Sequence, residues 1–366
     1  MRLLPYGCGL RVQDLAFAMK HYPLRREGNC LGLRLSLCEM VRMDTKLHRR
    51  QFIKLTAAAA TLPLTQPLVA AAAAKAPGAR PAVEDTSGLT AYELGPQIWI
   101  RHDDRQLTCY RAHRSQKYPY LFPLTGPASG LSLTDETTLP YPHHRSLFFG
   151  CDRVNGGNYW QEGYETGQIL SNGPKLAQAA KDLIVITDTC DWQKPGGPII
   201  MKDDRKLTVT APSDKLRLIE WVITLKAVEA ITVQKTNHSL FSMRAALDIT
   251  PKGGGNLVNA EGITDEKGTA GVKSAWCDFY GKRAAMPQII EGIAIFDHPR
   301  NLWAPTPWFT RDYGFASPTP LNFIEKPWAI AAGERVTFRY AVVLHVGDPA
   351  AANLAGLYKE WAAKPV

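Results

Sequence analysis

The sequence lacks the features by which several large classes of protein are recognised. It contains no C-x-x-C pair, so neither a zinc ribbon nor a thioredoxin-like redox site is expected. It has no glycine-rich phosphate loop and no alternation of strand and helix patterns, which argues against a nucleotide-binding α/β fold. Beyond residue 80 no apolar run approaches the roughly 20 residues that span a bilayer. We therefore expect no membrane span in the mature protein, no bound cofactor and no metal site with local ligand spacing.

The mature part also lacks an excess of positive charge. The formal net charge of the whole chain is +9, but residues 1–80 hold 13 Lys/Arg against four Asp/Glu, and residues 81–366 hold 30 of each. Because the whole basic excess lies in the N-terminal region, nucleic acid is not expected as a partner of the mature domain. The 45% of hydrophobic and 21% of charged residues are ordinary for a soluble globular protein.

The N-terminal region carries the pattern of a twin-arginine signal. Arg49-Arg50 stand before Phe52-Ile53-Lys54, and an Ala/Leu/Thr-rich stretch follows and ends in the alanines at 70–74. Twin arginines, a modest apolar segment and small residues at its end are typical of substrates of the Tat export machinery. Pro63 and Pro67 make this stretch a poor permanent membrane helix. The alternative is an alanine-rich cytoplasmic helix.

These patterns divide the N-terminal region into three segments. Met43 would start the signal with a short basic region, so residues 1–42 are predicted to be a misassigned upstream segment. Residues 43–75 are the predicted signal peptide, and residues 76–92, rich in Ala, Pro and Gly, are the predicted linker. The mature protein is therefore expected to be periplasmic or secreted, with residues 93–366 as a single domain.

The cysteines leave two possibilities open. Three of the seven lie in the doubtful upstream segment, and the mature part keeps four that are widely spaced: Cys109, Cys151, Cys190 and Cys277. An oxidising periplasm would permit one disulfide. Because Tat substrates usually fold before export, free buried thiols are an equal alternative.

Most of the mature domain has the period-two pattern of β-strands. Ile98-Trp99-Ile100 and Leu107-Thr108-Cys109-Tyr110 flank the turn-like His102–Arg105, which predicts a hairpin, and the run 183–187 predicts a further strand. Two longer runs place every second residue on one apolar face. These residues are Arg217, Ile219, Trp221, Ile223 and Leu225 in the first run, and Val336, Phe338, Tyr340, Val342 and Leu344 in the second.

Only the C-terminal tail has helical spacing. Leu354, Leu357, Tyr358 and Trp361 recur within residues 349–364, as in a helix packed on a sheet edge. Regularly spaced strands without βαβ units predict an all-β fold, a large antiparallel β-sandwich with this short C-terminal helix. The length of the domain favours two large sheets packed face to face, with long loops over one concave side.

Three clusters of residues have side chains suited to chemistry. The first is Pro140–Gly150, with His143, His144 and Arg145, which continues to Asn155-Gly156-Gly157-Asn158-Tyr159-Trp160. Histidine titrates near neutrality and therefore suits proton transfer. If the segment is extended, His143 and Arg145 share one face. The turn with its amides and aromatic rings suits a sugar, and a structural loop with solvated histidines is the alternative.

The second cluster runs from Lys235 to Arg244 and places His238 among Thr, Asn and Ser at the start of a predicted strand. The third joins Trp276-x-Asp278-x-Tyr280-Gly281 to later residues, of which Trp303, Trp308, Arg311 and Tyr313 could form a wall for a ring and an anionic group. These later residues are Asp297, His298, Asn301, Trp303, Trp308, Arg311 and Tyr313. A hydrogen-bonded turn histidine and ordinary core aromatics are the respective alternatives.

On these clusters the chain resembles the secreted PmoA family of unknown function, over about residues 115–348. The motifs that carry the resemblance are Tyr118-Pro119-Tyr120, His143-His144-Arg145, Asn155-Gly156 with Trp160, Phe241 with Arg244, Trp276-x-Asp278-x-Tyr280-Gly281, and Asp297-His298-Pro299-x-Asn301 with Trp308, Arg311 and Tyr313. The chain departs from the family pattern at Thr236-Asn237-His238-Ser239, where Thr-Lys-Glu-Gly is more usual. The family label refers to a membrane-bound methane oxygenase subunit, whose several spans the mature domain lacks.

A weaker resemblance links the second cluster to galactose mutarotase-like proteins. Thr236-Asn237-His238-Ser239-x-Phe241 is similar to their Thr-Asn-His-Ser-Tyr-Phe segment, whose histidine acts on the sugar ring oxygen. Gly333-Glu334 is similar to the turn before their last strand. The resemblance implies a β-supersandwich with a sugar on its concave face. The same architecture serves epimerases, hydrolases and lyases, so it does not choose a reaction.

The preferred hypothesis is a periplasmic carbohydrate-active enzyme that performs lyase, epimerase or hydrolase chemistry. The residues expected to exchange protons or orient the groups that do are His143, His144, His238, Asp297 and His298. The residues expected to bind substrate are Arg145, Asn155, Asn158, Trp160, Arg244, Asn301, Trp308, Arg311 and Tyr313. Hydrolysis by two carboxylates needs a second acid beside Asp297, and Glu325, Asp278 and Asp152 are candidates.

Two other functions remain open at this point. One is a sugar-binding protein without catalytic activity that uses the same face. The other is a metal-dependent enzyme with His143, His144 and His298 as ligands, although no local ligand spacing supports it.

Overall fold

The computed structural model describes residues 85–161 and 163–365. The upstream segment predicted over 1–42 and the signal peptide predicted over 43–75 lie outside these residues. The strands are β1 Leu89–Leu94, β2 Gln97–His102, β3 Arg105–Arg111, β4 Tyr120–Leu124, β5 Leu147–Cys151, β6 Gln168–Ser171, β7 Lys175–Ala179, β8 Leu183–Gln193, β9 Ile199–Ser213, β10 Leu216–Ala227, β11 Ile231–Val233, β12 Ser239–Arg244, β13 Asn256–Asn259, β14 Trp276–Arg283, β15 Met286–Asp297, β16 Trp308–Arg311, β17 Phe315–Pro318, β18 Trp328–Ile330 and β19 Arg335–Val346. The helices are α2 Asp265–Thr269, α3 Leu354–Ala362 and three single 3₁₀ turns, η1 Tyr164–Thr166, η2 Leu247–Ile249 and η3 Pro251–Gly253.

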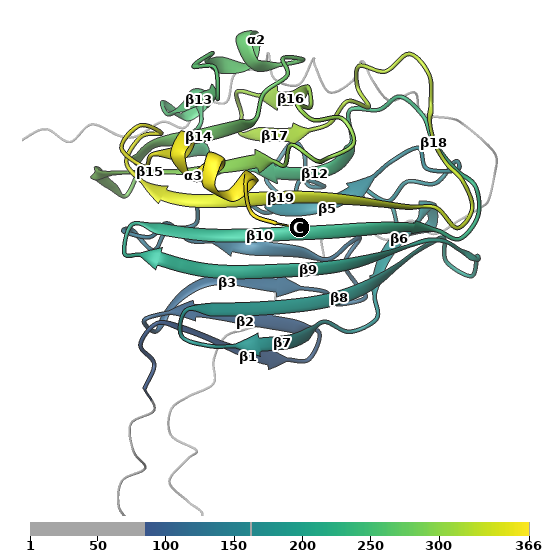
Figure 1. The fold of residues 1–366 in the computed structure, drawn as a ribbon, viewed down its shortest axis with the longest axis horizontal. Coiled ribbons are helices and arrows are strands. Elements are labelled where there is room, and N and C mark those ends of the chain that lie inside the picture. Colours follow the sequence, from purple (N-terminus) through teal and green to yellow (C-terminus); the bar gives the residue numbers. More distant parts are fainter. Residues whose placement is uncertain (1–84, 162, 366) are drawn as a thin grey trace, which may run out of the picture. The chain divides into compact units, whose positions relative to one another are not determined.

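The strands form two large antiparallel sheets and one small one (Figure 1). The eight-stranded sheet has the order β1-β2-β3-β4-β5-β12-β17-β16. The nine-stranded sheet has the order β13-β14-β15-β19-β10-β9-β8-β6, with β7 paired to β8, and β11 pairs with β18 separately. The predicted all-β antiparallel sandwich with a short C-terminal helix is confirmed.

The main core lies between the two large sheets. Tyr110 of β3 meets Trp221 of β10 with ring centroids 6.2 Å apart, and Phe241 of β12 stacks on Tyr340 of β19 at 4.4 Å. Offset-stacked and edge-to-face aromatic pairs stabilise a core beyond their buried area. The apolar faces predicted from period-two spacing are therefore the faces that the sheets turn toward each other.

The predicted hairpin at 98–110 is confirmed as β2 and β3. Asp103 and Asp104 form its two-residue turn with φ values of 49° and 61°. Positive φ at both central residues is the type I′ geometry, which matches the twist of the strands and which aspartate tolerates better than most residues.

Two predicted boundaries differ from the structure. The linker predicted over 76–92 is too long at its C-terminal end, because β1 begins at Leu89 and pairs with β2. The C-terminal helix is shorter than predicted and packs on a sheet face, not on an edge. Leu354 and Trp361 of α3 join a small second core with residues of β14, β15 and β19 on the nine-stranded sheet. No helix within the described ranges is long and apolar enough to cross a bilayer.

The four cysteines of the mature domain are buried free thiols. Cys109, Cys151, Cys190 and Cys277 form no disulfide with one another. Burial raises the pKa of Cys109 to about 11 and raises the pKa of the other three well above the ordinary value of a thiol. The thiols thus behave as small apolar core residues.

An ion pair is buried inside the sandwich. Asp203 and Arg205 of β9 are fully buried, with Nε 2.6 Å from Oδ1, and Trp192 donates to Oδ2 of Asp203 at 2.7 Å. Removing one partner of such a pair leaves the other charge uncompensated in a medium that solvates it poorly.

We expect Asp203→Asn to lower the free energy of unfolding by about 3 kcal/mol, because it leaves Arg205 without its counter-charge. Urea unfolding followed by fluorescence measures this. Asp204→Asn is the matched control, since Asp204 and its partner Arg335 are about half exposed and such pairs contribute at most about 1 kcal/mol. Equal effects of the two substitutions would contradict the prediction.

Candidate functional site

The candidate site lies on the face of the eight-stranded sheet that is turned away from the nine-stranded sheet. On β5, Phe149 contacts Trp192 of β8 with ring centroids 6.3 Å apart, whereas Phe148 stacks on Tyr118 at 4.7 Å. Successive residues of a strand point to opposite faces. Phe148 therefore marks this second face, which we call the site face.

The pairing of β5, β12 and β17 assembles the site face from three distant segments. Ser242 of β12 is opposite Phe148, and Arg244 is opposite Phe315 of β17. Residues directly opposite in an antiparallel pair share a face. Arg244 and Phe315 therefore lie on the site face.

His143 and His144 reach this face from a turn before β5. His144 N–H donates to Tyr141 O at 3.0 Å, so the segment is not extended. The prediction that His143 and Arg145 share one face required an extended segment, so it does not apply here. Instead, the His143 and His144 rings contact each other with centroids 4.5 Å apart, and His144 stacks on Phe315 at 4.5 Å.

His144 is buried and electrically neutral. Only 4% of it is exposed, and its Nδ1 has no hydrogen-bond partner among residues 85–161 and 163–365. Burial, followed by the charges of His143, Arg244 and His238, lowers the pKa of His144 to about 2. A neutral imidazole with an unused nitrogen can hydrogen-bond a ligand but is a very weak base.

His238 joins the two histidines from the start of β12. Its ring centroid lies 5.4 Å from that of His143, and 23% of its side chain is exposed. Its Nδ1 lies 3.3 Å from Oδ2 of Asp152, whose other oxygen accepts from the hydroxyl of Thr236. Asp152 thereby holds one edge of the ring and leaves Nε2 for a ligand.

Two tyrosines and an arginine complete the cluster. Tyr141 and Tyr313 stack with centroids 5.0 Å apart, and 37% of Tyr141 is exposed. The guanidinium of Arg244 lies 4.4 Å from the centroid of the Tyr313 ring. We call His143, His144, His238, Tyr141, Tyr313 and Arg244 the histidine cluster.

Two further predicted binding residues lie beside this cluster. Arg145 donates to Oε1 of Gln116 and lies 5.8 Å from the Tyr120 ring centroid. Arg311 pairs with Glu266 at 3.1 Å and covers Phe309 at 4.1 Å. Its charge also acts on Tyr313, whose pKa burial raises to about 12. Arg311 thus stands next to the cluster, with its charge already paired.

The structure does not bring the Asp297-His298 motif to the cluster. His298 is 3% exposed, and its ring centroid lies 5.0 Å from that of Trp361 in α3, on the nine-stranded sheet. Asp297 is 2% exposed and accepts hydrogen bonds from Asn301 and Thr306, while burial raises its pKa to about 6. Both predicted catalytic residues therefore lie away from the histidine cluster, and the bonds of Asp297 hold a loop beside α3.

Four predicted binding residues serve the fold instead. Asn301 bonds the backbone of Arg339 in both directions, and Asn155 bonds Thr232 N and Ala230 O. Asn158 accepts from the backbone N–H groups of Trp160 and Gln161. Trp308 is fully buried and donates to Ser274 O at 2.9 Å. The amide oxygens of these three asparagines accept from backbone N–H groups, and the indole of Trp308 is buried.

Trp160 has a different place from the predicted one. It is fully buried, packs on Phe148 at 4.7 Å and lies 5.8 Å from the ring of His238. A stacking platform must be exposed, so Trp160 supports the histidines from below, and the exposed ring is that of Tyr141.

The histidine set of the metal-dependent alternative is not assembled. His298 lies with α3, away from the rings of His143 and His144. Within the described ranges no group of three or more His, Cys, Asp or Glu side chains is arranged to hold a metal ion.

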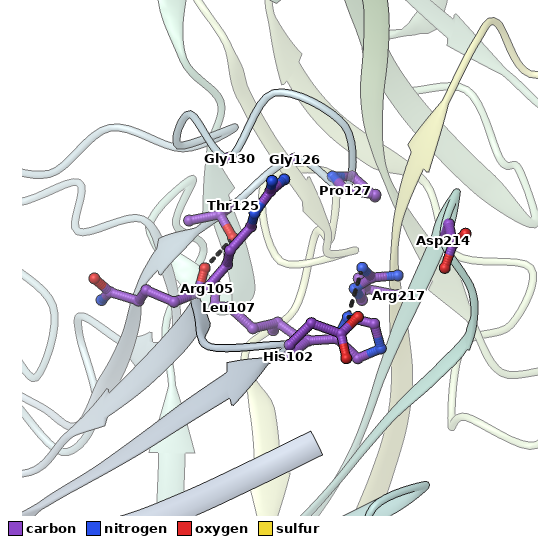
Figure 2. A pocket seen from close by; sticks show the side chains of 11 residues that line it. His102, Arg105, Leu107, Thr125, Gly126, Pro127, Gly130, Asp214 and Arg217 are labelled. Atoms are coloured by element: carbon purple, nitrogen blue, oxygen red, sulfur yellow. Dashed lines mark hydrogen bonds and ion pairs between the residues drawn. The ribbon is translucent and has the colours of Figure 1, made fainter. Parts of the chain in front are cut away.

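A separate pocket of about 360 Å³ opens where the β2–β3 hairpin meets the segment after β4 and the β9–β10 turn (Figure 2). Arg217 donates from Nη2 to Nδ1 of His102 at 3.0 Å, and Asp103 lies 3.2 Å from the same nitrogen. Burial and the charge of Arg217 lower the pKa of His102. His102, Arg217 and Asp103 interact with one another here, and none of the three clustered histidines lines the pocket, so we place the candidate site at the histidine cluster.

Comparison with known proteins identifies the family but not an activity. The profile of a family of unknown function, DUF6807, matches residues 97–359. The chain belongs to this family. No functionally curated protein matches it.

Solved structures give only distant likenesses for this DUF6807 member. A galactose mutarotase related enzyme from Lactobacillus acidophilus is 9% identical, with 70% of this chain and 97% of that chain covered and a TM-score of 0.27. A GalM/aldose epimerase homologue from C. elegans is also 9% identical, with 71% and 96% covered and a TM-score of 0.28. At these scores the likenesses carry no argument about the site.

The sequence patterns of this DUF6807 member did not single out three residues of the site. Tyr141 and Phe315 were not identified as contacts of His144, and Asp152 was considered only as a second acid. The one feature of the sequence that could have identified Asp152 is its position directly after the apolar run that forms β5. Only the pairing of β5 with β12, which sets Cys151 opposite Ser239, brings it to His238.

The buried His144 should make stability depend on pH. Below its ordinary pKa of 6.5 the unfolded chain binds a proton that the folded chain does not take up until about pH 2, so stability falls as the pH falls. We expect the wild type to lose about 2 kcal/mol more than His144→Phe between pH 6.5 and pH 5, measured by urea unfolding. The raised pKa of Asp297 has the opposite sign but is common to both proteins and cancels. Parallel pH profiles would contradict the prediction.

Proposed function

We propose that this DUF6807 member is an exported enzyme that moves protons on a bound sugar, with the histidine cluster as its active site. The observation that carries the proposal is the meeting of residues 141–145, 238–244 and 313–315. Their rings are in mutual contact, with the His143 centroid 4.5 Å from His144 and 5.4 Å from His238. Imidazole rings that share one site, with a carboxylate beside one of them, are suited to general acid–base catalysis.

The burial of the side chains suggests different roles for the histidines. His238 is partly exposed and held by Asp152, which suits a group that gives and takes the proton. His144 stays neutral and is suited to hydrogen-bond a hydroxyl. His143 lies between them.

Two features support a sugar as the ligand. Tyr141 and Tyr313 form a partly exposed stacked pair beside the histidines, and aromatic faces are suited to the apolar face of a sugar ring. The similarity of the Thr236–Phe241 segment to the galactose mutarotase-like motif gives the second support. Both leave lyase, epimerase and hydrolase chemistry open.

The proposal includes export to the periplasm. It rests on Arg49-Arg50 before Phe52-Ile53-Lys54 and on the Ala/Leu-rich stretch that follows. The resemblance to the PmoA-labelled family stays a prediction, because the matching profile carries another label.

The activity is tested by incubating the mature protein with a broad panel of oligosaccharides. Unsaturated products, released reducing ends and anomeric exchange are followed together. We expect one of these signals, and His238→Gln to lower kcat by about 100-fold, as for loss of a general acid–base group. His298→Gln is the matched control and should keep wild-type kcat, because His298 packs against α3. Sugar binding without any turnover, or an equal loss in the control, would overturn the proposal.

Asp152 is expected to act as a positioning residue for His238. Asp152→Asn keeps an oxygen near Thr236 but no longer selects the Nδ1–H tautomer of the ring. We expect kcat to fall by roughly 10-fold with a smaller change in KM, and the ¹⁵N NMR signals of His238 to show both tautomers. An unchanged tautomer with reduced activity would contradict this role.

A further inference from the structure

Arg244 is a buried cation that forms no ion pair with any of the residues that the structure describes. Its exposed fraction is 4%, and its Nε and Nη1 are buried without any hydrogen-bond partner in the part of the chain that the structure describes. Its one close neighbour of note is the Tyr313 ring, with the centroid 4.4 Å from the guanidinium carbon. A cation–π contact satisfies none of the five N–H donors.

The nearby acid does not neutralise this charge. Asp135 N–H donates to Arg244 O at 3.0 Å, which brings the two residues together through their backbones. The Asp135 carboxyl nevertheless forms no ion pair with the guanidinium, and burial raises the pKa of Asp135. Asp135 and Arg244 thus act on each other only through space, and Nε and Nη1 of Arg244 stay without a partner within the described ranges.

Buried charges in native proteins are normally paired, because an unpaired one loses its hydration without compensation. A buried charge without a partner in the protein can be paired by an opposite charge on a bound ligand. Arg244 lies at the place that the proposed function gives to the substrate, since its guanidinium is over the Tyr313 ring and Tyr313 stacks with His144. The missing partner is therefore expected on the ligand.

We propose that Arg244 binds the carboxylate of a uronic acid, so that the substrate is an acidic sugar or an oligosaccharide that contains one. This inference rests on the proposed function and names its substrate class. A guanidinium accepts a carboxylate through two parallel N–H bonds, and the single cation matches the single charge of a uronate better than the double charge of a phosphate.

The carboxylate also determines which proton the histidines can remove. In a uronate the C5 carbon carries the carboxylate, so negative charge develops on C5 and the carboxylate when a histidine removes the C5 proton. Pairing of the carboxylate with Arg244 stabilises this charge. The electron pair then either receives a proton again at C5, or forms the C4=C5 double bond while the C4–O bond breaks and the leaving oxygen is protonated. Both outcomes balance without an oxidant or a reductant.

The first experiment needs only the wild-type protein. Oligosaccharides of galacturonate, glucuronate and mannuronate are compared with their methyl esters, with the corresponding neutral sugars and with the neutral sugars as 6-phosphates. Binding is measured by calorimetry, and C5 exchange with D₂O and unsaturated products by NMR. We expect binding and C5 exchange with at least one uronate and neither with its methyl ester.

The second experiment uses Arg244→Gln and Arg244→Lys. We expect Arg244→Gln to weaken uronate binding by at least about 30-fold, because truncating one partner of a buried charge pair costs about this much affinity. We expect Arg244→Lys to bind uronate more tightly than Arg244→Gln, because it keeps the positive charge. Arg335→Gln, at an exposed ion pair, is the control and should bind as the wild type does.

The outcomes separate the two proposals. Turnover of neutral sugars or methyl esters as good as that of uronates, or preference for the phosphates, would overturn the inference about Arg244 while the proposed function stands. Absence of binding and turnover across all four groups would overturn both.

Discussion

Strands β5 and β12 are covered on both faces, and the rest of the molecule is built around this constraint. Phe149 and Phe241 face the nine-stranded sheet, while Phe148 and Arg244 face the other way. Because the side-chain period of a strand is two, a shift of one residue in either strand would exchange these sets. It would place a guanidinium in the apolar core and phenylalanine rings in the site. The packing of the sandwich and the geometry of the site are therefore set by the same register.

The site face differs from the main core in how its buried charges are paired. Between the sheets, Asp203, Arg205 and Trp192 bond one another, and the buried charges are paired. On the site face, the Nδ1 of His144, the Nε and Nη1 of Arg244 and the Oγ of Ser242 have no partner among the described residues. Unsatisfied buried groups cost stability, so a fold keeps them where they have a function. The meeting of a neutral imidazole and a guanidinium without an ion pair on this face is the physical reason for which we propose substrate binding there.

The two kinds of histidine in this protein show how environment determines role. His238 and His144 share a site, but one is held by a carboxylate at partial exposure, and the other is buried against Phe315 and kept neutral. His298 also has polar neighbours in the sequence, Asp297 and Arg300. It nevertheless packs against Trp361 of α3. The residue type is the same in all three cases. The burial of each side chain and its contacts determine the different environments.

The sequence by itself determined the strand pattern, the hairpin at Asp103-Asp104, the C-terminal helix and the two segments that supply His143, His144 and His238. These features depend on local periodicity and turn chemistry, which neighbouring residues encode. Only the tertiary structure decided that residues 313–315 join these histidines and that Asp297, His298 and Asn301 do not. The order β5-β12-β17 brings together segments that are distant in the chain, and the choice of strand partner depends on the packing of the whole sandwich. A motif such as Asp-His-Pro looks the same in sequence whether its strand faces the site or the helix that covers the opposite sheet.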